Sequence, residues 1–526
     1  MAEETRNQGI SMAEETGNQG ISMENWDAIC VGAGITSLAF GAQLALRHPD
    51  ARILIIDKHS VPGGYATAFR RPKAEAVFDC SLHKLSGMQE GGNLKRIFSD
   101  LGLEDELSLK YPDDYFEACL PGENIKLGNN SDAVLRTLIS RYPEEATALH
   151  KFFDEVSVHG KNGYYQFQMM NGTYEPDFAQ LRYAHRHLKG ISVRDAFEER
   201  FSNGLLKEIL GAPGLYVGGF PEDLGYLYFL HVVYATLFRG NAYVRGTSQH
   251  LSDVLTKKII AAGGRVMLGT TVTKILSNES GDVVGVKTSR GSFFSKKAYI
   301  NVSPHYALGT LFERKPEVDA VVKKLHGLKP SRSTTTLYLT TDVDPIDLGF
   351  NSTEMMIIAH PSEDCFASRV HAQSYEEDEM ANERSFWSNS VMEVTNYHAL
   401  DPTGGRVICV NVLDSISHWP ERKSRGYKEK KKRAEKVLLE RLFVAKPQLE
   451  GHVVFTEVSS PKTCLRFTNN TDGAGFGAMV SKDISGHLFH YSFPIKGVHF
   501  LSAWVAGPSY EAAFCFAEMK VDNWEV

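Results

Sequence analysis

The apolar positions near the N-terminus form two short runs with a longer mixed segment between them. Residues 28–31 are apolar throughout, a glycine turn follows, residues 36–47 are rich in Ala and Leu, and residues 53–56 are apolar again. Short apolar runs are typical of buried parallel strands, and the segment between them has the length of a helix. The pattern therefore predicts a strand–helix–strand unit that ends at Asp57.

Further elements are expected along the rest of the chain. Residues 146–239 predict a mainly helical, aromatic-rich region, and residues 116–126 predict a strand pair that turns at Pro121 and Gly122. The acidic stretch at 361–400 is expected to be an irregular surface loop. The other expected elements are helices at 247–262 and 510–519 and strands at 265–268, 272–277, 283–288, 293–299, 331–345, 405–413 and 498–501.

Three segments bear on targeting and on membrane contact. The apolar run at 226–238 is too short to cross a bilayer. It predicts either a buried wall or a patch that dips into a membrane surface. The basic residues 428–433 indicate a solvated helix face, with a membrane-contact patch as the alternative. Residues 1–23 hold a near-perfect repeat without apolar periodicity and without an apolar signal region, and we expect a disordered leader.

Composition narrows the class of protein. The chain is 42% hydrophobic and 23% charged, which allows large cores and predicts two or three domains. A net charge of −7 argues against a nucleic-acid partner, which would require a basic face. The seven cysteines are scattered without a C-x-x-C motif, so we expect a reducing compartment, no disulfide framework and no metal site. The expected location is cytoplasmic, with peripheral contact to a membrane as an option.

The strand–helix–strand unit carries the features of a dinucleotide-binding fold. Gly32 allows a tight turn out of the first strand, and Gly34 lets a diphosphate approach the backbone and the helix N-terminal amides. Asp57 has about the spacing expected of an acid that binds a ribose hydroxyl. The third glycine position is Ser37, which is small enough for close packing of helix on strand. A glycine turn without a ligand is the alternative.

A second glycine pair, Gly63-Gly64, lies just past this acid. A nicotinamide dinucleotide has no need of it, whereas FAD extends past the first turn and needs more exposed backbone. The pair therefore indicates FAD, and an ordinary loop after Pro62 is the alternative. The later glycine-rich segment 472–477 does not follow a strand and has no acid at the right distance, so we expect no second dinucleotide site.

Four passages of the sequence resemble the FAD-dependent family of phytoene desaturases, carotenoid cis–trans isomerases and retinol saturases. The resemblance is strongest to the branch that contains the retinol saturases and carotenoid isomerases. The resemblance implies an α/β fold in which a discontinuous Rossmann-like FAD-binding domain holds an inserted α+β substrate domain. The FAD-binding domain would comprise 24–90, 240–330 and 455–526, and the substrate domain 91–239 and 331–454. The passages are DAICVGAGITS, GGYATAF followed by FDCSLHKLSG, YVRGTSQHLSDVLTKKIIAAGGRV and GVHFLSAWVAGPSYEAAF.

The resemblance also assigns residues to the cofactor. Val272 matches the residue whose backbone meets the adenine, and the turn that starts at Ser502 is expected at the ribityl and flavin end. The family usually has an acid at the end of the last strand, where this chain has Trp504, so that carboxylate bond to the cofactor is missing. The full set of expected cofactor-binding residues is Gly32, Gly34, Ile35, Asp57, Lys58, Gly63, Gly64, Thr67, Val272, Ser502, Trp504 and Ala512.

His83 takes the place of the histidine in the branch's F-D-x-x-x-H pattern, near the expected flavin face. It would act as an acid or base or position the substrate, and the alternative is a histidine that fixes its loop by hydrogen bonding. Tyr243 and Arg245 lie where the chain re-enters the FAD domain, and we expect them to serve loop structure or a phosphate contact.

The resemblance implies an enzyme that saturates, desaturates or isomerises carbon–carbon double bonds of an apolar polyene or isoprenoid by hydride exchange with the flavin, with an external electron donor or acceptor. Aromatic stretches such as 164–167 suit an apolar tunnel, although similar spacings occur in ordinary cores. A flavin amine oxidase shares the first motif but fits the later passages poorly. A non-enzymatic scaffold for prenylated proteins, as in the GDP-dissociation inhibitors, would lack the intact glycines that this chain keeps.

Overall fold

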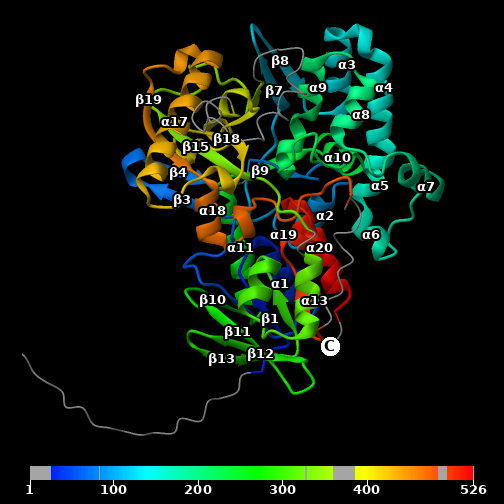
Figure 1. Ribbon diagram of the computed structural model, residues 1–526, viewed down its shortest axis with the longest axis vertical. Helices are drawn as coiled ribbons and strands as arrows, with labels where there is room; N and C mark the ends of the chain where they lie inside the picture. The colour runs from blue at the N-terminus through cyan, green and yellow to red at the C-terminus, as the bar shows by residue number, and fades with distance from the viewer. Residues whose placement is uncertain (1–24, 82, 326–327, 359–385, 484–494, 525–526) are drawn as a thin grey trace, which may run out of the picture.

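The computed structural model contains a parallel sheet, a larger mixed sheet and a helical region, arranged around the middle of the molecule (Figure 1). The leader expected at 1–23 lies outside the described residues. The structure describes residues 25–81, 83–325, 328–358, 386–483 and 495–524.

The five-stranded parallel sheet forms the lower part of the molecule in Figure 1. Its first two strands along the chain are apolar and buried at every position, as expected of a sheet that is covered on both faces. Because all five strands run the same way, their carboxyl ends meet at one edge, where Val31 lies opposite Ile56 and Ile300. Across the sheet the strands are β10 (Arg265–Met267), β2 (Ile53–Ile56), β1 (Ala28–Val31), β14 (Ala298–Ile300) and β20 (Val498–Phe500).

Helix α1 (Ile35–Arg47) packs against both α11 (Thr247–Ala261) and α20 (Tyr510–Asp522). The contact with α11 is close because Gly41 carries no Cβ: a methyl group there would lie 2.9 Å from a side-chain carbon of Ile259. These helices and the sheet share one apolar core. The predicted strand–helix–strand unit and the Rossmann-like fold class are confirmed.

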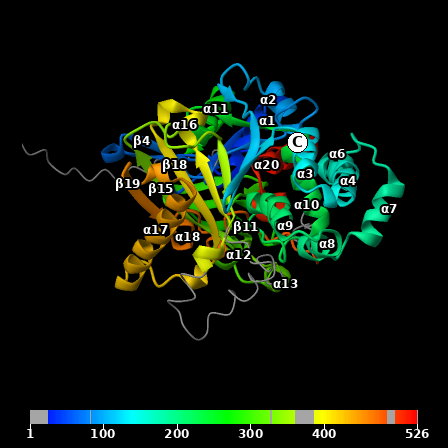
Figure 2. The ribbon, with the colours of Figure 1, turned by 90° about the horizontal axis from the view of Figure 1, so that it is seen from above.

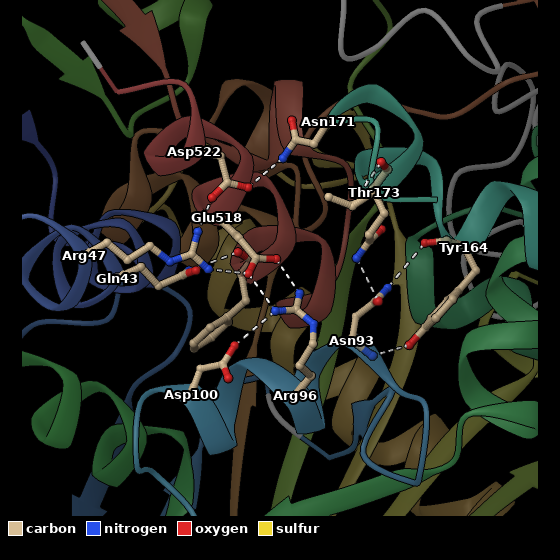
Figure 3. A network of polar contacts seen from close by, with 12 residues as sticks. Gln43, Arg47, Asn93, Arg96, Asp100, Tyr164, Asn171, Thr173, Glu518 and Asp522 are labelled. Atoms are coloured by element: carbon tan, nitrogen blue, oxygen red, sulfur yellow. Dashed lines mark hydrogen bonds and ion pairs between the residues drawn. The ribbon is translucent and has the colours of Figure 1, made fainter. Parts of the chain in front are cut away.

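A network of charged residues joins three helices beside this sheet (Figure 3). Arg47 at the end of α1 and Arg96 of α2 (Asn93–Asp100) both pair with Glu518 of α20, at 2.6 and 2.5 Å. Arg47 also reaches Asp522 one helical turn further on. Burial raises the pKa of Glu518, but the two guanidinium groups outweigh this effect and hold the pKa below its ordinary value. The network therefore joins α1 and α2, from the first hundred residues, to α20 near the end of the sequence.

A seven-stranded sheet lies in the upper part of the molecule in Figure 1, and Figure 2 shows it from above. The strands expected at 331–345 and 405–413 are confirmed as an antiparallel pair, and so is the strand pair expected at 116–126. Helix α17 (Arg425–Ala445) covers one face with its buried leucines. In order, the strands are β19 (Val453–Ser459), β15 (Ser333–Thr341), β18 (Val407–Asp414), β17 (Met392–Asn396), β16 (Glu354–Ile357), β7 (Asp114–Leu120) and β8 (Glu123–Gly128).

The region expected at 146–239 is mainly helical, with one further helix before it at 131–141. Its core is aromatic: the rings of Phe152, Phe197 and Phe229 pack together. The apolar run at 226–238 lies inside this core, so it is a buried wall. No helix in the described part of the chain combines the length and apolarity that crossing a bilayer would require. The α-helices are α3 (Ser131–Arg141), α4 (Ala146–Glu155), α5 (Lys161–Tyr164), α6 (Gln166–Met170), α7 (Phe178–His187), α8 (Val193–Arg200), α9 (Gly204–Gly211) and α10 (Tyr226–Val233).

Three smaller sheets and several short helices complete the described chain. The small sheets contain β3 (Ala68–Arg71) with β4 (Ala76–Asp79), then β5 (Leu85–Ser86), β9 (Asn241–Val244) and β6 (Leu109–Lys110), and finally β11 (Val272–Ser277), β12 (Val283–Thr288) and β13 (Gly291–Phe294). The remaining α-helices are α12 (Pro304–Thr310), α13 (Pro316–Leu325), α16 (Tyr397–Leu400), α18 (Pro461–Thr468) and α19 (Ala503–Ala506).

The single strand expected at 293–299 was wrong, because the chain changes sheets within it. Strand β13 pairs with β12, whereas β14 joins the parallel sheet. Between them, the Ser295 hydroxyl accepts a hydrogen bond of 3.0 Å from the amide of Lys297 and turns the chain. Apolar periodicity does not report this break.

The surface loop expected at 361–400 was also wrong for its second half. Residues 361–385 lie outside the described residues, but β17 is buried at all five positions in the middle of the large sheet. The strand escaped prediction because it contains Glu393 and Asn396, which are typical of surfaces. Their burial is compensated by polar partners inside the fold.

The basic stretch 428–433 is only partly a solvated face. Lys430 is 1% exposed, and its ammonium group lies 5.4 and 5.5 Å from the ring centres of Trp387 and Trp419. Cation–π contacts of this kind offset the cost of burying the charge. The next residue, Lys431, lines the cavity described below.

Candidate cofactor site

A cavity of about 670 Å³ lies at the carboxyl edge of the parallel sheet, the position where open α/β sheets bind ligands. Its wall comes from the ends of β1 and β2, the two glycine turns, β3, α18 and α19. The structure brings eleven of the twelve expected cofactor-binding residues to this wall. They are Gly32, Gly34, Ile35, Asp57, Lys58, Gly63, Gly64, Thr67, Val272, Ser502 and Trp504.

The two glycine turns lie side by side and leave space that any larger residue would fill. The amide of Gly63 donates a hydrogen bond of 2.7 Å to the carbonyl of Ala33, inside the first turn. A Cβ on Gly64 would lie 3.2 Å from the Cα of Gly34. A Cβ on Gly63 would lie 2.0 Å from the carbonyl oxygen of Ala66. Both turns therefore present backbone directly to the cavity.

The N-terminus of α1 opens onto this space. Its cap residue, Gly34, offers no side-chain hydrogen bond to the free amides of the first turn. Since those amides and the helix dipole favour negative charge, the position suits a diphosphate. The cavity thus combines a helix N-terminus with two close backbone turns.

Asp57 has a structural function in addition to any ligand contact. Its two carboxylate oxygens accept hydrogen bonds from the amides of Ala33, at 2.7 Å, and of His59, at 2.8 Å. The acid therefore fixes the first glycine turn against the end of β2. The ribose contact expected of Asp57 stays a prediction.

Two buried donors in the cavity wall test whether the site fits a polar cofactor. The Nδ2 atom of Asn301 and the hydroxyl of Ser502 are buried and have no hydrogen-bond partner in the described part of the chain. Buried polar groups are rarely left unpaired, so such donors indicate a missing acceptor. A cofactor with phosphate and hydroxyl oxygens would supply acceptors at this place.

Helix α19 reaches the cavity, and α20 does not bring Ala512 to it. The Ala512 amide donates to the Ser509 hydroxyl at 3.1 Å, so its hydrogen bond is already made, and Ala512 is not among the residues of the cavity wall. Trp504 of α19 is one of the residues of the cavity wall, and its Nε1 donates to the side-chain oxygen of Asn470 at 3.3 Å. The missing family acid is therefore replaced by a large aromatic wall.

His83 is not among the residues of the cavity wall. Its Nε2 atom is 2.9 Å from a carboxylate oxygen of Glu393 on β17. Neighbouring Lys84 pairs with Glu354 on β16 at 2.6 Å. Sequence reasoning missed both acids, because they lie far along the chain in strands that carry no motif.

Tyr243 and Arg245 are also outside the cavity wall. Tyr243 is buried, and its ring packs edge-on against Tyr397. The amide of Arg245 donates to the carbonyl of Ser108 at 2.9 Å. These contacts match the loop-structure alternative for both residues, and no phosphate contact is needed to explain them.

The comparisons with known proteins agree with this geometry. A family model for NAD(P)-binding Rossmann-like domains matches residues 30–101. Prolycopene isomerase 2 from an Oncidium hybrid cultivar is 24% identical over 88% of this chain and 77% of its own length. The all-trans-retinol 13,14-reductase of Macaca fascicularis is 23% identical over 86% of this chain and 77% of its own length.

The chain is a distant relative of both groups of enzymes. The resemblance expected from the four sequence passages is thereby confirmed. Among solved structures, cyclohexylamine oxidase from Brevibacterium oxydans superposes with a TM-score of 0.61 at 15% identity, over 95% of this chain and 98% of that one. At this identity the likeness shows the fold alone.

Proposed function

We propose that the protein is an FAD-dependent enzyme that saturates, desaturates or isomerises carbon–carbon double bonds of an apolar polyene or isoprenoid. The proposal is carried by one observation: two adjacent glycine turns and an uncapped helix N-terminus meet in a single cavity. It is supported by the relatives, whose names describe isomerisation of prolycopene and reduction of all-trans-retinol.

The residues present would hold FAD along the whole cavity. The α1 amides after Gly34 would bind its diphosphate, Val272 would contact the adenine, and Ser502 would donate a hydrogen bond near the flavin end. Asn301 would donate from the end of β14. Once bound, FAD would supply the hydride acceptor or donor that no side chain of the protein provides.

The chain itself would bind and orient the apolar substrate. Trp504 lines the cavity and also belongs to the core of the helical region, so the cavity borders directly on apolar, aromatic side chains. Burial against such a wall would bind a polyene and exclude water from the reacting carbon. Reaction requires that this carbon lie within about 3.5 Å of the reactive flavin atom, so orientation is the main contribution of the protein.

The reaction partners follow from the same proposal. One nucleotide-binding unit holds one redox cofactor, so net saturation or desaturation would need an external electron donor or acceptor. A substrate that dissolves in lipid would favour contact with a membrane surface. The six described cysteines, all free, support a reducing compartment such as the cytoplasm.

Two measurements test the proposal. The purified protein is expected to show the absorption of an oxidised flavin and to bleach under dithionite, and denaturation is expected to release FAD. The reduced and the oxidised enzyme are then each incubated with prolycopene, all-trans-retinol and cyclohexylamine, and the products are separated. Conversion of a polyene supports the proposal, whereas oxidation of the amine alone would replace it with an amine oxidase. A colourless protein that binds no FAD in titration would refute it.

A further inference from the structure

Four ionisable side chains form a buried cluster beside the cofactor cavity. His83 pairs with Glu393 at 2.9 Å and Lys84 pairs with Glu354 at 2.6 Å. The phenol of Tyr216 donates to the second oxygen of Glu354 at 2.5 Å. The four ionisable side chains are only 1–17% exposed. Buried charges are costly unless they are balanced, and two cations balance two anions here only when His83 is protonated.

Two short paths along the fold connect this cluster to the cavity. Cys80 lines the cavity three residues before His83 in the same loop. On the other side, Phe476 follows a cavity-lining glycine and packs over Gly218, where an added Cβ would lie 2.3 Å from its ring. Two residues before Gly218, the ring of Tyr216 lies 5.4 Å from the ring of His83. The cluster is therefore joined to cavity-lining residues by two short stretches of the fold, one through Cys80 and one through Phe476.

The surroundings of His83 favour the imidazolium form. Burial alone would lower the pKa of His83, but the carboxylate of Glu393 outweighs it, so the pKa is raised above the ordinary 6.5. Glu354 adds to this rise, and Lys84 opposes it. In the same pair, His83 holds the pKa of Glu393 below its ordinary value, although burial raises it. Tyr216 is the other titratable group that faces the ring.

The two ring nitrogens of His83 have different positions. Nε2 faces Glu393, and Nδ1 has no hydrogen-bond partner within the described residues. The His83 side chain as a whole is 17% accessible. A carboxylate that orients an imidazole through one nitrogen and leaves the other free for proton transfer is the arrangement of many acid–base centres.

We propose that His83 is the proton donor for saturation of the polyene. This inference rests on the proposed function. Hydride addition to one carbon of a double bond leaves an electron pair on its neighbour, and the proton from Nδ1 of His83 forms the second C–H bond. The N–H bond breaks, the imidazole is left neutral beside Glu393, and water restores the proton. The electrons come from reduced FAD, which an external two-electron donor such as dithionite regenerates. In desaturation, neutral His83 accepts the proton instead.

A divalent cation is the rival occupant of this cluster. The ligand atoms of His83, Glu354 and Glu393 lie within 4.8 Å of one another. However, the Lys84 ammonium already neutralises Glu354, so an added divalent ion would leave the buried cluster with excess positive charge. The ionic pairs therefore favour proton transfer over metal binding, and metal analysis belongs to the test.

The test compares the FAD-loaded wild type with His83→Gln, Glu393→Gln and a control, His150→Gln, at an exposed histidine of α4. Each dithionite-reduced enzyme is mixed anaerobically with all-trans-retinol or prolycopene in D₂O, and the saturated product is analysed by mass and by NMR. The pH dependence of the rate is measured for all four proteins, and ¹⁵N NMR of histidine-labelled enzyme follows the protonation of His83. Flavin content and melting temperature report folding.

We expect wild type and His150→Gln to place one deuterium on each of the two carbons that are saturated, because the reduced flavin and the imidazolium both exchange their N–H protons with D₂O. His83→Gln should form product about 100-fold more slowly or worse, with flavin content and KM little changed. Glu393→Gln should keep activity at low pH and lose it at a lower pH than wild type, which a purely structural effect would not produce. The His83 NMR signal should stay in the imidazolium form above pH 6.5 in wild type and lose that property in Glu393→Gln.

Four outcomes would overturn the inference. Saturation by His83→Gln at the wild-type rate would remove the proton-donor role while leaving the proposed function intact. A neutral His83 below pH 6.5, or one bound divalent metal ion per chain whose removal abolishes activity, would replace it with a different use of the cluster. A wild type that carries FAD but saturates no polyene refutes the saturation reaction itself, and the proton-donor role fails with it.

Discussion

Glu511 is a buried acid, and its burial should make the stability of the fold depend on pH. The residue lies in the first turn of α20, is 5% exposed and accepts a hydrogen bond of 2.7 Å from the Ser86 hydroxyl. Gly87 makes room for it, since a Cβ there would lie 2.0 Å from a carboxylate oxygen. Burial raises the pKa of Glu511 from the ordinary 4.5 to about 7, and bonds from Tyr164 and Ser86 offset only part of this rise.

The raised pKa makes stability depend on pH in a defined direction. Between pH 4.5 and 7, the folded protein keeps the proton on Glu511 and the unfolded chain has lost it. Stability therefore falls as the pH rises through this window and is level above it. The rise from 4.5 to about 7 corresponds to a loss of about 3 kcal/mol, at about 1.4 kcal/mol per pH unit. This loss is complete at pH 8 and absent at pH 4.

Glu511→Gln should remove this penalty because a neutral amide does not titrate. We expect the variant to match the wild type near pH 4 and to be more stable by about 3 kcal/mol at pH 8. Calorimetric melting temperatures at five pH values between 4 and 8 measure the difference, which should grow steadily between pH 4.5 and 7. Glu104→Gln, which removes an exposed ion pair with Lys95, is the control and should show a small, nearly constant shift. A constant shift for Glu511→Gln would show that burial does not raise the pKa of Glu511.

Three further substitutions test other parts of the fold. Gly63→Ala should lose bound flavin and about 2 kcal/mol or more of stability, since the new Cβ would lie 2.0 Å from the Ala66 carbonyl oxygen at a backbone φ of +119°. The control is Gly122→Ala, where φ is +85° and the space around the Cβ is open, and this variant should keep its flavin. Glu518→Gln should lower stability by about 1–3 kcal/mol, read as a drop in melting temperature, because Arg47 and Arg96 each lose one of two charged partners. Asn301→Ala should weaken FAD binding about tenfold by titration, yet change the stability of the apoprotein by less than about 1 kcal/mol, since its Nδ2 has no described partner.

The cofactor end of the molecule could be predicted because its signals are local. The turn at Gly32, the helix after it and Asp57 lie within one short stretch, and each has a backbone reason for its identity. The structure adds what spacing cannot report: the second turn bonds back to the first through Gly63, and Asp57 is already engaged by two amides. These contacts depend on how the loops pack, which a linear motif does not encode.

The acid partners of His83 could not be predicted for a different reason. Glu354 and Glu393 come from neighbouring strands whose pairing, with Met356 opposite Glu393, exists only in the folded sheet. From the sequence alone, a glutamate in an acidic region is expected on the surface, in contact with solvent. The burial of each glutamate is explained by the cationic side chain that pairs with it in the folded protein, and this side chain lies far away along the sequence.

The loop after β4 shows why its sequence pattern is tightly constrained. Asp79 accepts hydrogen bonds from the amide and hydroxyl of Ser248, at 2.7 and 2.8 Å, and so fixes the N-terminus of α11. Ser81 donates to the carbonyl of Tyr65, at 2.9 Å, in the turn that borders the cavity. The first half of the loop therefore belongs to the cofactor side.

The second half of the same loop belongs to the other side of the molecule. His83 and Lys84 reach acids of the large sheet, and Ser86 reaches Glu511 of α20. A shift of the loop by one residue would break contacts with the large sheet, with two helices and with the turn at Tyr65 at once, so its position is fixed from several directions. A histidine held this firmly beside a cofactor cavity can keep one nitrogen for its carboxylate and the other for chemistry, because the loop does not depend on the second nitrogen for its structure.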